Sequence, residues 1–568
     1  MRRIVTALAL AVLSAWVAVA QERADPYQVA TVCTSVPINI GRRIAVASGG
    51  ELQQALDAAM SGDTILLAPG ALFTPTAPEG SFMLRNRPIA EGQWVVVRSA
   101  HAAFDANGEV PPHTRLEPSR ADLLPKVRAT RTNLPAFKAE PGAHGYRLIG
   151  LDVGIDTSVT QLTNLVELGN GGETTLAQQP NNIIVDRSWL HGNDTGNFRR
   201  GVLMNGRNLA VIDSRLENFH DSNSDSQAVG GSTGAGPFKI VNNYLEAASE
   251  NILFGGNDPT IAALVPSDIE VARNLSTKRL AWQAAKVPVK NAFELKNARR
   301  VIVEGNIFEN VWVSGQDGGA ILLKSVNQDG KCDWCVTEYV TFRRNIVRKA
   351  AHGLTINAVE VGRRGLPNPV AANHIRIEDV LFEDIGGAQW GGGGKLFRIY
   401  GGAADVSITH VTSLGNAWNI LEANGPDDSN PRFVFAYNIV ERKTYGIGAG
   451  GDEGAKTLTR NFSPFTYRQN LVVNTSKGSG QDVSNAVLEA RYPATTMVAG
   501  DWSDVGFANG SAGLAPTSRY AGIADNGRDL GASMVAITNA QSRLVRDADG
   551  CSSAIAIPRK RAGTPANP

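Results

Sequence analysis

The sequence predicts an all-β chain that folds as a right-handed parallel β-helix, a solenoid of about ten coils with an N-terminal capping helix. Three observations lead to this prediction. A short apolar segment that ends in asparagine recurs along the chain, the recurrence has a regular period, and each copy alternates apolar and polar residues as a strand with one buried face does.

The repeated segment has the form apolar, x, apolar, x, x, Asn. Its six clear copies are residues 238–243, 269–274, 301–306, 340–345, 433–438 and 465–470, and the weaker copies are residues 183–186, 209–213, 375–379 and 406–410. Asn243, Asn274 and Asn306 are 31 and 32 residues apart, which sets the length of one coil. We therefore expect these asparagines to stack in successive coils and to satisfy neighbouring backbone groups. Leucine-rich and helical repeats fit less well, because the copies lack a Leu-x-x-Leu-x-Leu frame and any long 3.6-residue period.

An amphipathic helix precedes the repeats and is expected to cover the open end of the solenoid. Residues 48–51 (Ser-Gly-Gly-Glu) supply its N-cap, and Gly62 ends it before a strand at residues 64–68. Four apolar residues share one face of this helix: Leu52, Leu56, Ala59 and Met60. Such a lid is needed because unpaired strand edges promote aggregation.

The first twenty residues have the pattern of a secretory signal peptide. Arg2 and Arg3 precede an apolar run at residues 4–19, and small residues at 18–20 provide a cleavage site. A membrane anchor is the alternative, but the run is shorter than the roughly 20 residues of a spanning helix. We therefore predict an exported protein, secreted or periplasmic, with no membrane span after cleavage.

The rest of the chain divides into three segments by its pattern. We expect an N-terminal extension at residues 21–47, the β-helix with its cap at 48–500, and a C-terminal capping segment with a disordered tail at 501–568, where the asparagine register fades. The formal net charge is +1, from 55 basic and 54 acidic residues, so the chain has no overall field to attract nucleic acid. A monomer without a nucleic-acid partner is expected.

Four cysteines are present, and export permits disulfides. Cys332 and Cys335 lack the second pair or the histidines of a zinc site, and no thioredoxin-like pattern surrounds them, so a local disulfide is favoured. Cys33 and Cys551 would then tie the two ends of the chain together. The sequence alone allows three pairings.

The helix, the segment Gly-Asp-Thr-Ile-Leu-Leu-Ala-Pro-Gly at residues 62–70 and the asparagine-marked coils resemble the pectate-lyase-like superfamily of right-handed β-helix proteins. The resemblance covers about residues 45–500. It implies the fold, but the superfamily holds lyases, hydrolases, esterases, epimerases and non-catalytic adhesins. The resemblance therefore does not name a reaction.

Each coil contains a second strand whose outward residues are expected to form one charged stripe. Alternation places Phe293, Leu295 and their counterparts inside. The expected outward residues are Glu294, Lys296, Leu322, Lys324, Thr355, Asn357, Arg398 and Tyr400. Stacked at roughly 4.8 Å per strand, they would form a groove that suits a linear uronate polymer. The alternative is that these charges only keep an exposed sheet soluble.

Cleavage of a uronate polymer by β-elimination needs a neutralised carboxylate and a base that removes the C5 proton. We predict Lys296 and Lys324 as base candidates, because the pKa of a lysine falls readily on burial, and Arg398 as a clamp for the carboxylate. The candidate substrate-binding residues are Glu294, Asn297, Asn357, Tyr400, Arg200 and His191.

An acidic cluster suggests a calcium site formed by Glu246, Glu250 and Asp258. The resemblance implies the same cofactor, since Ca²⁺ often bridges protein and uronate in lyases of the superfamily, and this segment is distantly similar to the metal-binding stretch of the chondroitinase-B and alginate-lyase branch. The Asn-Lys-Ser and Arg-His-Gly signatures of that branch are absent. A solvated loop of turn-forming residues is the alternative.

The sequence therefore predicts an exported polysaccharide lyase acting on an acidic polymer, with two alternatives. Asp221 and Asp225 could serve a glycoside hydrolase as acid and base, although an Asx-rich turn explains the same residues and the polygalacturonase motifs are absent as a set. A non-catalytic polysaccharide-binding protein would keep the coils without needing a base.

Overall fold

The structure is a computed structural model that describes residues 25–35, 39–368, 370–415, 417–423 and 428–542. The predicted signal peptide at residues 1–20, Cys551 and the predicted disordered end beyond residue 542 lie outside the described residues. In the described ranges, no helix has the length and apolar character needed to cross a bilayer.

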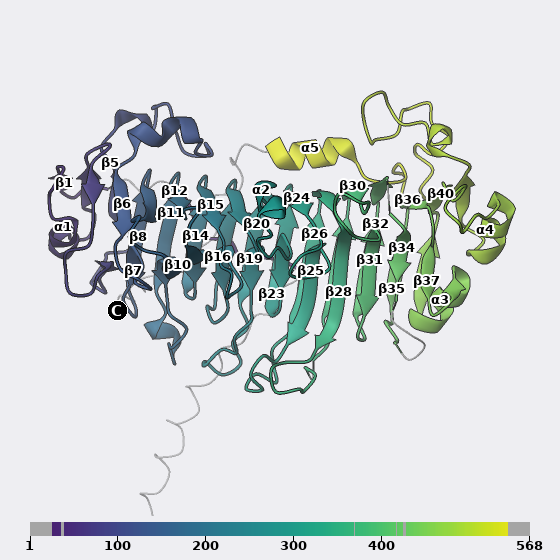
Figure 1. Cartoon of the computed structure of the whole chain (residues 1–568), viewed down its shortest axis with the longest axis horizontal. Helices are drawn as coiled ribbons and strands as arrows, with labels where there is room; N and C mark the ends of the chain where they lie inside the picture. Colours follow the sequence, from purple (N-terminus) through teal and green to yellow (C-terminus); the bar gives the residue numbers. More distant parts are fainter. Residues whose placement is uncertain (1–24, 36–38, 369, 416, 424–427, 543–568) are drawn as a thin grey trace, which may run out of the picture.

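The chain forms three long parallel sheets that run side by side along a solenoid (Figure 1). From β2 to β37, strands consecutive in the chain fall into sheets A, B and C in turn, so each of these coils contributes a strand to each sheet. The sheets have 14, 14 and 13 strands. The right-handed parallel β-helix is confirmed, but the prediction of about ten coils is too low. The repeat pattern misses the first four coils because their turns into sheet B carry no asparagine.

Sheet A consists of β1 (Arg43–Val46), β2 (Thr64–Leu67), β5 (Val95–Ser99), β8 (His144–Ile149), β11 (Asn181–Asp186), β14 (Arg207–Ile212), β17 (Phe238–Val241), β20 (Ser267–Ala272), β23 (Ala298–Glu304), β26 (Thr337–Arg343), β29 (Asn373–Glu378), β32 (Ala404–Thr409), β35 (Phe433–Ala436) and β39 (Phe465–Arg468).

Sheet B consists of β3 (Leu72–Phe73), β6 (Lys126–Ala129), β9 (Asp152–Ile155), β12 (Trp189–His191), β15 (Arg215–Phe219), β18 (Tyr244–Ala247), β21 (Leu275–Thr277), β24 (Ile307–Val311), β27 (Ile346–Ala350), β30 (Leu381–Ile385), β33 (Thr412–Leu414), β36 (Ile439–Arg442), β40 (Leu471–Asn474) and β41 (Met497–Ala499).

Sheet C consists of β4 (Phe82–Leu84), β7 (Phe137–Ala139), β10 (Gln161–Leu168), β13 (Asn197–Met204), β16 (Gln227–Gly231), β19 (Glu250–Phe254), β22 (Phe293–Leu295), β25 (Gly319–Val326), β28 (His352–Glu360), β31 (Lys395–Tyr400), β34 (Asn419–Glu422), β37 (Ile447–Ala449) and β38 (Asp452–Glu453). Of these, β38 is antiparallel to its neighbour β37.

The α-helices are α1 (Leu52–Ala58), α2 (Ala281–Ala284), α3 (Ala455–Asn461), α4 (Asn485–Arg491) and α5 (Met534–Ser542), and the 3₁₀ helices are η1 (Ala102–Phe104), η2 (Pro118–Leu123), η3 (Leu176–Gln178) and η4 (Trp502–Asp504).

The predicted capping helix is α1, at the N-terminal end of the solenoid (Figure 1). Leu52, Leu56 and Ala59 are buried against the first coils. The helix ends at Ala58, so Met60 is 59% exposed and does not share the buried face.

The predicted asparagine ladder lies at the turn from sheet A to sheet B. The backbone N–H and the side-chain amide of Asn243 both donate to Oδ1 of Asn274, at 2.9 and 3.0 Å. Asn274 donates in the same way to Asn306, and Asn306 to Asn345. A second, shorter ladder joins Asn438 to Asn470. All these asparagines are buried, so the ladder supplies partners to backbone groups that water cannot reach.

The residue before each ladder position adopts a left-handed conformation that closes the turn in two residues. Its φ is 58° at Asn242, 55° at Arg273, 69° at Gly305 and 54° at Arg344. A β-strand cannot continue through such a conformation, so the chain turns sharply at the same point in each coil of the ladder.

Two apolar residues, Val380 and Val411, interrupt the ladder, because they align with Asn345 and Asn438 in the coils on either side. The segment before α5 packs against this interruption. Arg528 forms ion pairs with Glu378 and Asp379, and the N–H of Ala532 donates to Thr412 Oγ1 at 2.9 Å. The C-terminal segment thus braces the two coils in which a valine stands in place of the ladder asparagine.

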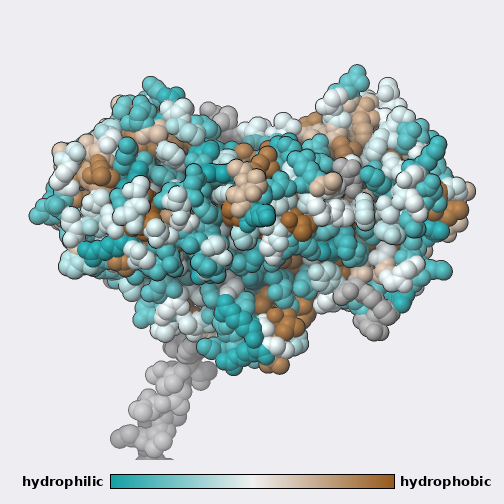
Figure 2. All heavy atoms as spheres, viewed as in Figure 1, coloured by the Kyte–Doolittle hydropathy of each residue, from teal (hydrophilic) through white to brown (hydrophobic). Residues whose placement is uncertain are grey.

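The interior of the solenoid is apolar. Inward residues of sheet C such as Phe293, Ile321, Leu354 and Phe397 are fully or almost fully buried and belong to one continuous core, as the alternation predicts. On the face shown in Figure 2, hydrophilic residues predominate and hydrophobic residues form only small groups.

Loops cover the edges of sheet C on both sides. The loops from sheet B carry Trp282, Trp312 and Trp390, which pack into one apolar cluster. The loops toward sheet A include the predicted disulfide, because Cys332 and Cys335 are joined. Outward residues of sheet C are therefore framed by structure that the repeats themselves do not contain.

Replacement of Asn274 by alanine should lower the free energy of unfolding by about 3 kcal/mol, since it removes the partner of the buried Asn243 N–H and of the Ile240 carbonyl in the preceding coil. The midpoint of urea unfolding measures this loss. Asn223→Ala is the matched control, because Asn223 is exposed. Equal midpoints for the two variants would contradict a stabilising ladder.

Candidate active site

The predicted charged stripe lies on the outer face of sheet C. Strand register places its residues in two rows across successive coils: Glu294, Leu322, Thr355 and Arg398 in one, and Lys324, Asn357 and Tyr400 in the other. Lys296 directly follows β22 and stands beside Lys324. We use the name charged stripe for Glu294, Lys296, Lys324, Asn357, Arg398 and Tyr400.

The charged stripe is more buried than its outward position suggests. The side chain of Glu294 is 1% exposed and that of Lys324 is 5% exposed, whereas those of Lys296 and Arg398 keep 16% and 12%. Glu294 therefore does not present a surface to substrate, which contradicts its prediction as a substrate-binding residue.

Lys324 is held between two carboxylates. Its Nζ lies 3.1 Å from Oε1 of Glu294 and 2.7 Å from Oε2 of Glu360. Burial acts to lower the pKa of Lys324, but the charges of Glu294 and Glu360 outweigh it and the pKa is raised. A raised pKa argues against Lys324 as a base, because a base must lose its proton near the working pH. We assign Lys324 a positioning role.

Lys296 is the more accessible of the two predicted bases. Its Nζ lies 3.7 Å from Oε1 of Glu294, and its partly exposed side chain can reach a ligand on the face of sheet C. Burial raises the pKa of Glu294, but the charges of Lys324 and Lys296 outweigh burial and hold that pKa low. The buried carboxylate therefore anchors both lysines.

A second group of charges adjoins Lys296. Lys290 forms an ion pair with Asp225 and lies 4.0 Å from Oε1 of Glu250, while Oε2 of Glu250 accepts a hydrogen bond from Gln227 at 2.8 Å. Burial, reinforced by the charges of Glu294 and Asp225, raises the pKa of Glu250 to about 7. Burial would also raise the pKa of Asp225, but its hydrogen bond and ion pair with Lys290 lower it.

Arg398 is held by Asp317 and by Thr355, whose Oγ1 accepts from Nε at 3.0 Å. Lys296 and Arg398 belong to coils three strands apart, β22 and β31, which corresponds to about 14 Å at the usual strand spacing. The two side chains therefore do not act on the same sugar unit. The prediction of Arg398 as the clamp for the carboxylate that Lys296 would activate is corrected accordingly.

The other predicted substrate-binding residues differ in their surroundings. Asn297 is buried, and its amide donates to the carbonyl of Val326 at 2.8 Å, so it stabilises a turn and does not face substrate. Asn357 and Tyr400 are partly exposed beside Lys324 and Arg398. Burial lowers the pKa of Arg200, on β13, to about 9.

His191 is not part of this face. It lies on β12 in sheet B, where its Nε2 pairs with Asp152 at 2.9 Å and its Nδ1 contacts the carbonyl of Gly192. Its prediction as a substrate-binding residue is not supported, because the charged stripe lies on sheet C and sheets B and C face different directions.

The three predicted calcium ligands do not form one site. Glu246, on β18 in sheet B, binds Arg279 and the Tyr244 hydroxyl, whereas Glu250 lies around the corner on sheet C. Asp258 accepts three backbone N–H groups of the loop that contains the disulfide. In the described part of the chain, no three His, Cys, Asp or Glu residues are grouped to hold a metal ion. These residues therefore do not fit the calcium site that the resemblance implies.

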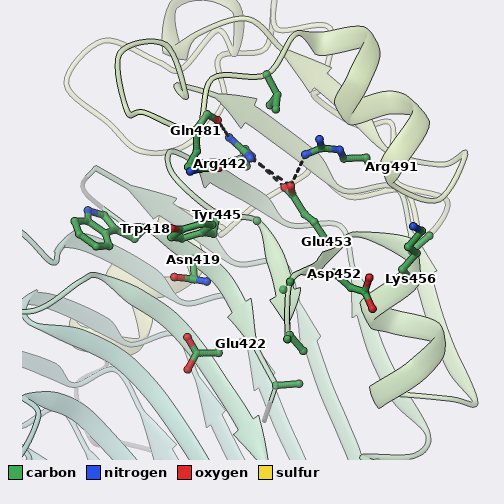
Figure 3. Close-up of a pocket in the computed structure, with 18 of the residues that line it drawn as sticks. Trp418, Asn419, Glu422, Arg442, Tyr445, Asp452, Glu453, Lys456, Gln481 and Arg491 are labelled. Carbon is green, nitrogen blue, oxygen red and sulfur yellow. Dashed lines mark hydrogen bonds and ion pairs between the residues drawn. The ribbon is translucent and has the colours of Figure 1, made fainter. Parts of the chain in front are cut away.

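A cavity of about 1270 Å³ lies at the C-terminal end of sheet C, and the sequence reasoning missed it. Glu422, Trp418, Tyr445 and Lys456 are among the residues that line it (Figure 3). Glu422 continues a row of the stripe, because it pairs with Arg398. A signal was present in the sequence, because Trp418 directly precedes the apolar residues of β34 and a glycine-rich segment follows Tyr445.

Comparison with known proteins gives structural similarities only. No protein-family model matches the chain, and no curated protein matches its sequence. The alginate lyase AlyGC of family 6 is similar with a TM-score of 0.48 and 12% identity over 80% of this chain, which spans about half (53%) of that lyase.

Two further solved structures are similar. A mannuronic-acid-specific family 6 lyase from human gut microbiota has a TM-score of 0.47 and 12% identity, covering 81% of this chain and 92% of the lyase. A family 87 α-1,3-glucanase from Streptomyces thermodiastaticus has a TM-score of 0.41 and 12% identity, covering 78% and 70%. Each of these likenesses has a TM-score below 0.5, so they leave the reaction open.

Replacement of Lys324 by methionine should lower the free energy of unfolding by about 3 kcal/mol, since it removes one partner of a buried ion pair. Lys296→Met is the matched comparison and should cost less, because Lys296 is more exposed and farther from Glu294. The double variant Glu294→Gln/Lys324→Met should recover part of the loss. Urea midpoints test this, and equal losses for both lysine variants would be evidence against the assigned positioning role.

The raised pKa of Glu250 predicts a pH-dependent stability. Since the native carboxyl holds its proton up to about pH 7 and an unfolded one releases it near its ordinary pKa, the stabilising contribution is full below that ordinary pKa and is lost as the pH rises through about 7. Relative to Glu250→Gln, the wild type should lose about 3 kcal/mol across this window. Thermal melts of both proteins from acid to neutral pH measure it, and a constant difference would refute the raised pKa.

Proposed function

We propose that this chain is an exported enzyme that cleaves a uronate-containing polysaccharide by β-elimination on the outer face of sheet C. The observation that carries the proposal is the charged stripe, in which side chains from successive coils lie in register on one wall. Strand spacing of roughly 4.8 Å is close to the length of a sugar unit, about 5 Å, so one coil can serve one unit.

Lys296 is the proposed base, and Lys290 is the proposed cation that neutralises the uronate carboxylate. Lys296 would accept the C5 proton, the C4–O4 bond would break as the C4–C5 double bond forms, and the leaving oxygen would take up a proton. Lys290 lies near Lys296, because the charges of Lys290 and Lys296 both act to lower the pKa of Glu250, and Lys290 Nζ is 4.0 Å from Oε1 of Glu250. Export through the signal peptide and a monomeric state are part of the proposal.

Incubation with pectate, alginate and glycosaminoglycans, each with and without Ca²⁺, tests the reaction through the ultraviolet absorbance of the unsaturated product. Lys296→Met should reduce kcat by about 100-fold or more while the urea midpoint changes little. Lys126→Met, which changes an exposed lysine on sheet B, is the control and should retain activity. Full turnover by Lys296→Met would show that another group is the base.

Hydrolysis is the second candidate, favoured by the contrasting carboxyls Glu250 and Asp225. The pKa of Glu250 is raised to about 7 and that of Asp225 is lowered, as required of an acid and a base in one site. New reducing ends without unsaturated product, lost in Glu250→Gln, would support this reaction. Retention of polymer without any product would instead support a binding protein.

A further inference from the structure

The cavity at the C-terminal end of sheet C continues the face that carries the charged stripe. Arg398 on β31 pairs in register with Glu422 on β34, and Glu422 lines the cavity. The cavity volume of about 1270 Å³ exceeds the roughly 300–1,000 Å³ of a typical small-molecule site, so it has room for more than one sugar ring. Sheet C ends in the antiparallel strand β38, and residues of β38 and of the following helix α3 also line the cavity (α3 in Figure 1).

Two aromatic side chains from successive coils line the cavity. Trp418 and Tyr445 are 47% and 46% exposed, and the N–H of Tyr445 donates to the carbonyl of Trp418 at 2.7 Å. A Cβ at Gly393, in the preceding coil, would lie 3.2 Å from the indole ring, so a glycine there leaves space for the ring. Large aromatic rings are usually buried, and two exposed rings beside polar groups form a surface on which the C–H faces of sugars can stack.

Basic side chains outnumber acidic ones at the cavity by one: Lys395, Arg442, Lys456 and Arg491 line it together with Glu422, Asp452, Glu453 and Asp482, and Arg460 outside the lining pairs with Asp452. Glu453 accepts from both Arg442 at 3.0 Å and Arg491 at 2.7 Å, so this cluster carries one uncompensated positive charge (Figure 3). Lys456 lines the cavity and has no ion pair within the described residues. Lys395 and Glu422 neutralise each other at 2.7 Å. A carboxylate-bearing sugar would therefore find aromatic and cationic partners in the same cavity.

We propose that this cavity binds the terminal units of the uronate polysaccharide and so fixes where the chain is cut, an inference that rests on the proposed function. Lys296 follows β22 and Trp418 precedes β34, which lie four strands apart, or about 19 Å at the usual strand spacing, the length of about four sugar units. Because sheet C stops at β38, a chain end seated in the cavity has nowhere to advance. The products are then short oligosaccharides of one dominant length.

Trp418→Ala and Tyr445→Ala test the inference, with Trp418→Tyr as the control that keeps a ring. Binding of alginate and polygalacturonate hexasaccharides is measured by calorimetry in a Lys296→Met background, where turnover is suppressed. We expect each alanine variant to weaken binding at least tenfold and Trp418→Tyr to bind nearly as wild type does. Product lengths from polymer are measured in the otherwise unaltered enzyme, where the alanine variants should give a broad distribution. Urea midpoints establish that each variant is folded.

The outcomes separate the two proposals. Unchanged affinity and product length in both alanine variants, with unsaturated product still formed by the wild type, would overturn the inference and leave the lyase proposal standing. A wild type that neither cleaves nor binds any of the polymers would overturn both. Equally tight binding of a neutral glucan hexasaccharide in the same cavity would overturn the assignment of an acidic ligand.

Discussion

The two-residue turn from sheet A to sheet B is the constraint on which the remaining structure depends. A left-handed residue reverses the chain, and the buried asparagine after it donates its amide to the coil beyond. Since side chains alternate faces along a strand, one extra residue at this turn would exchange the inner and outer faces of the strand that follows. In the coils that carry the ladder, insertions are instead found at the other two corners, where they frame sheet C without changing its register.

The charged stripe follows from this register, and its charges are held by one another. Burial of a carboxylate such as Glu294 is tolerated only because Lys324, Lys296 and Asn291 surround it. The same proximity gives the carboxyl groups different pKa values. The pKa values of Asp225 and Glu294 are lowered, whereas that of Glu250 is raised to about 7. A face of this kind is organised before any substrate binds, which lowers the reorganisation that a charged transition state requires.

The sequence predicted those features of the fold that depend on the period of the repeat. The inward and outward residues of sheet C, the stacking of Asn243 on Asn274 and the neighbouring of Lys324 and Asn357 all follow from a fixed coil length. It could not predict features that arise outside the repeat. Glu360 reaches Lys324 because of a register shift between β25 and β28, and so the burial and raised pKa of that lysine were not foreseen.

Errors at the candidate site have the same origin. Glu246 and Glu250 are close in sequence, but the corner between sheets B and C separates them. Acidic residues that are neighbours in the sequence therefore do not form a metal site. The cavity was missed because its walls come from the ends of several coils and from helices near the C-terminus, which no repeat relates.

The bracing of Val380 and Val411 by the segment before α5 bears on how the chain is made. Coils of a solenoid contact only their neighbours, so the early coils can form while synthesis continues. The coils around Val380 and Val411 obtain part of their support from Arg528 and Ala532, which leave the ribosome more than a hundred residues later. We infer that this middle region matures last, although the residues that build it are neither the first nor the last to be synthesised.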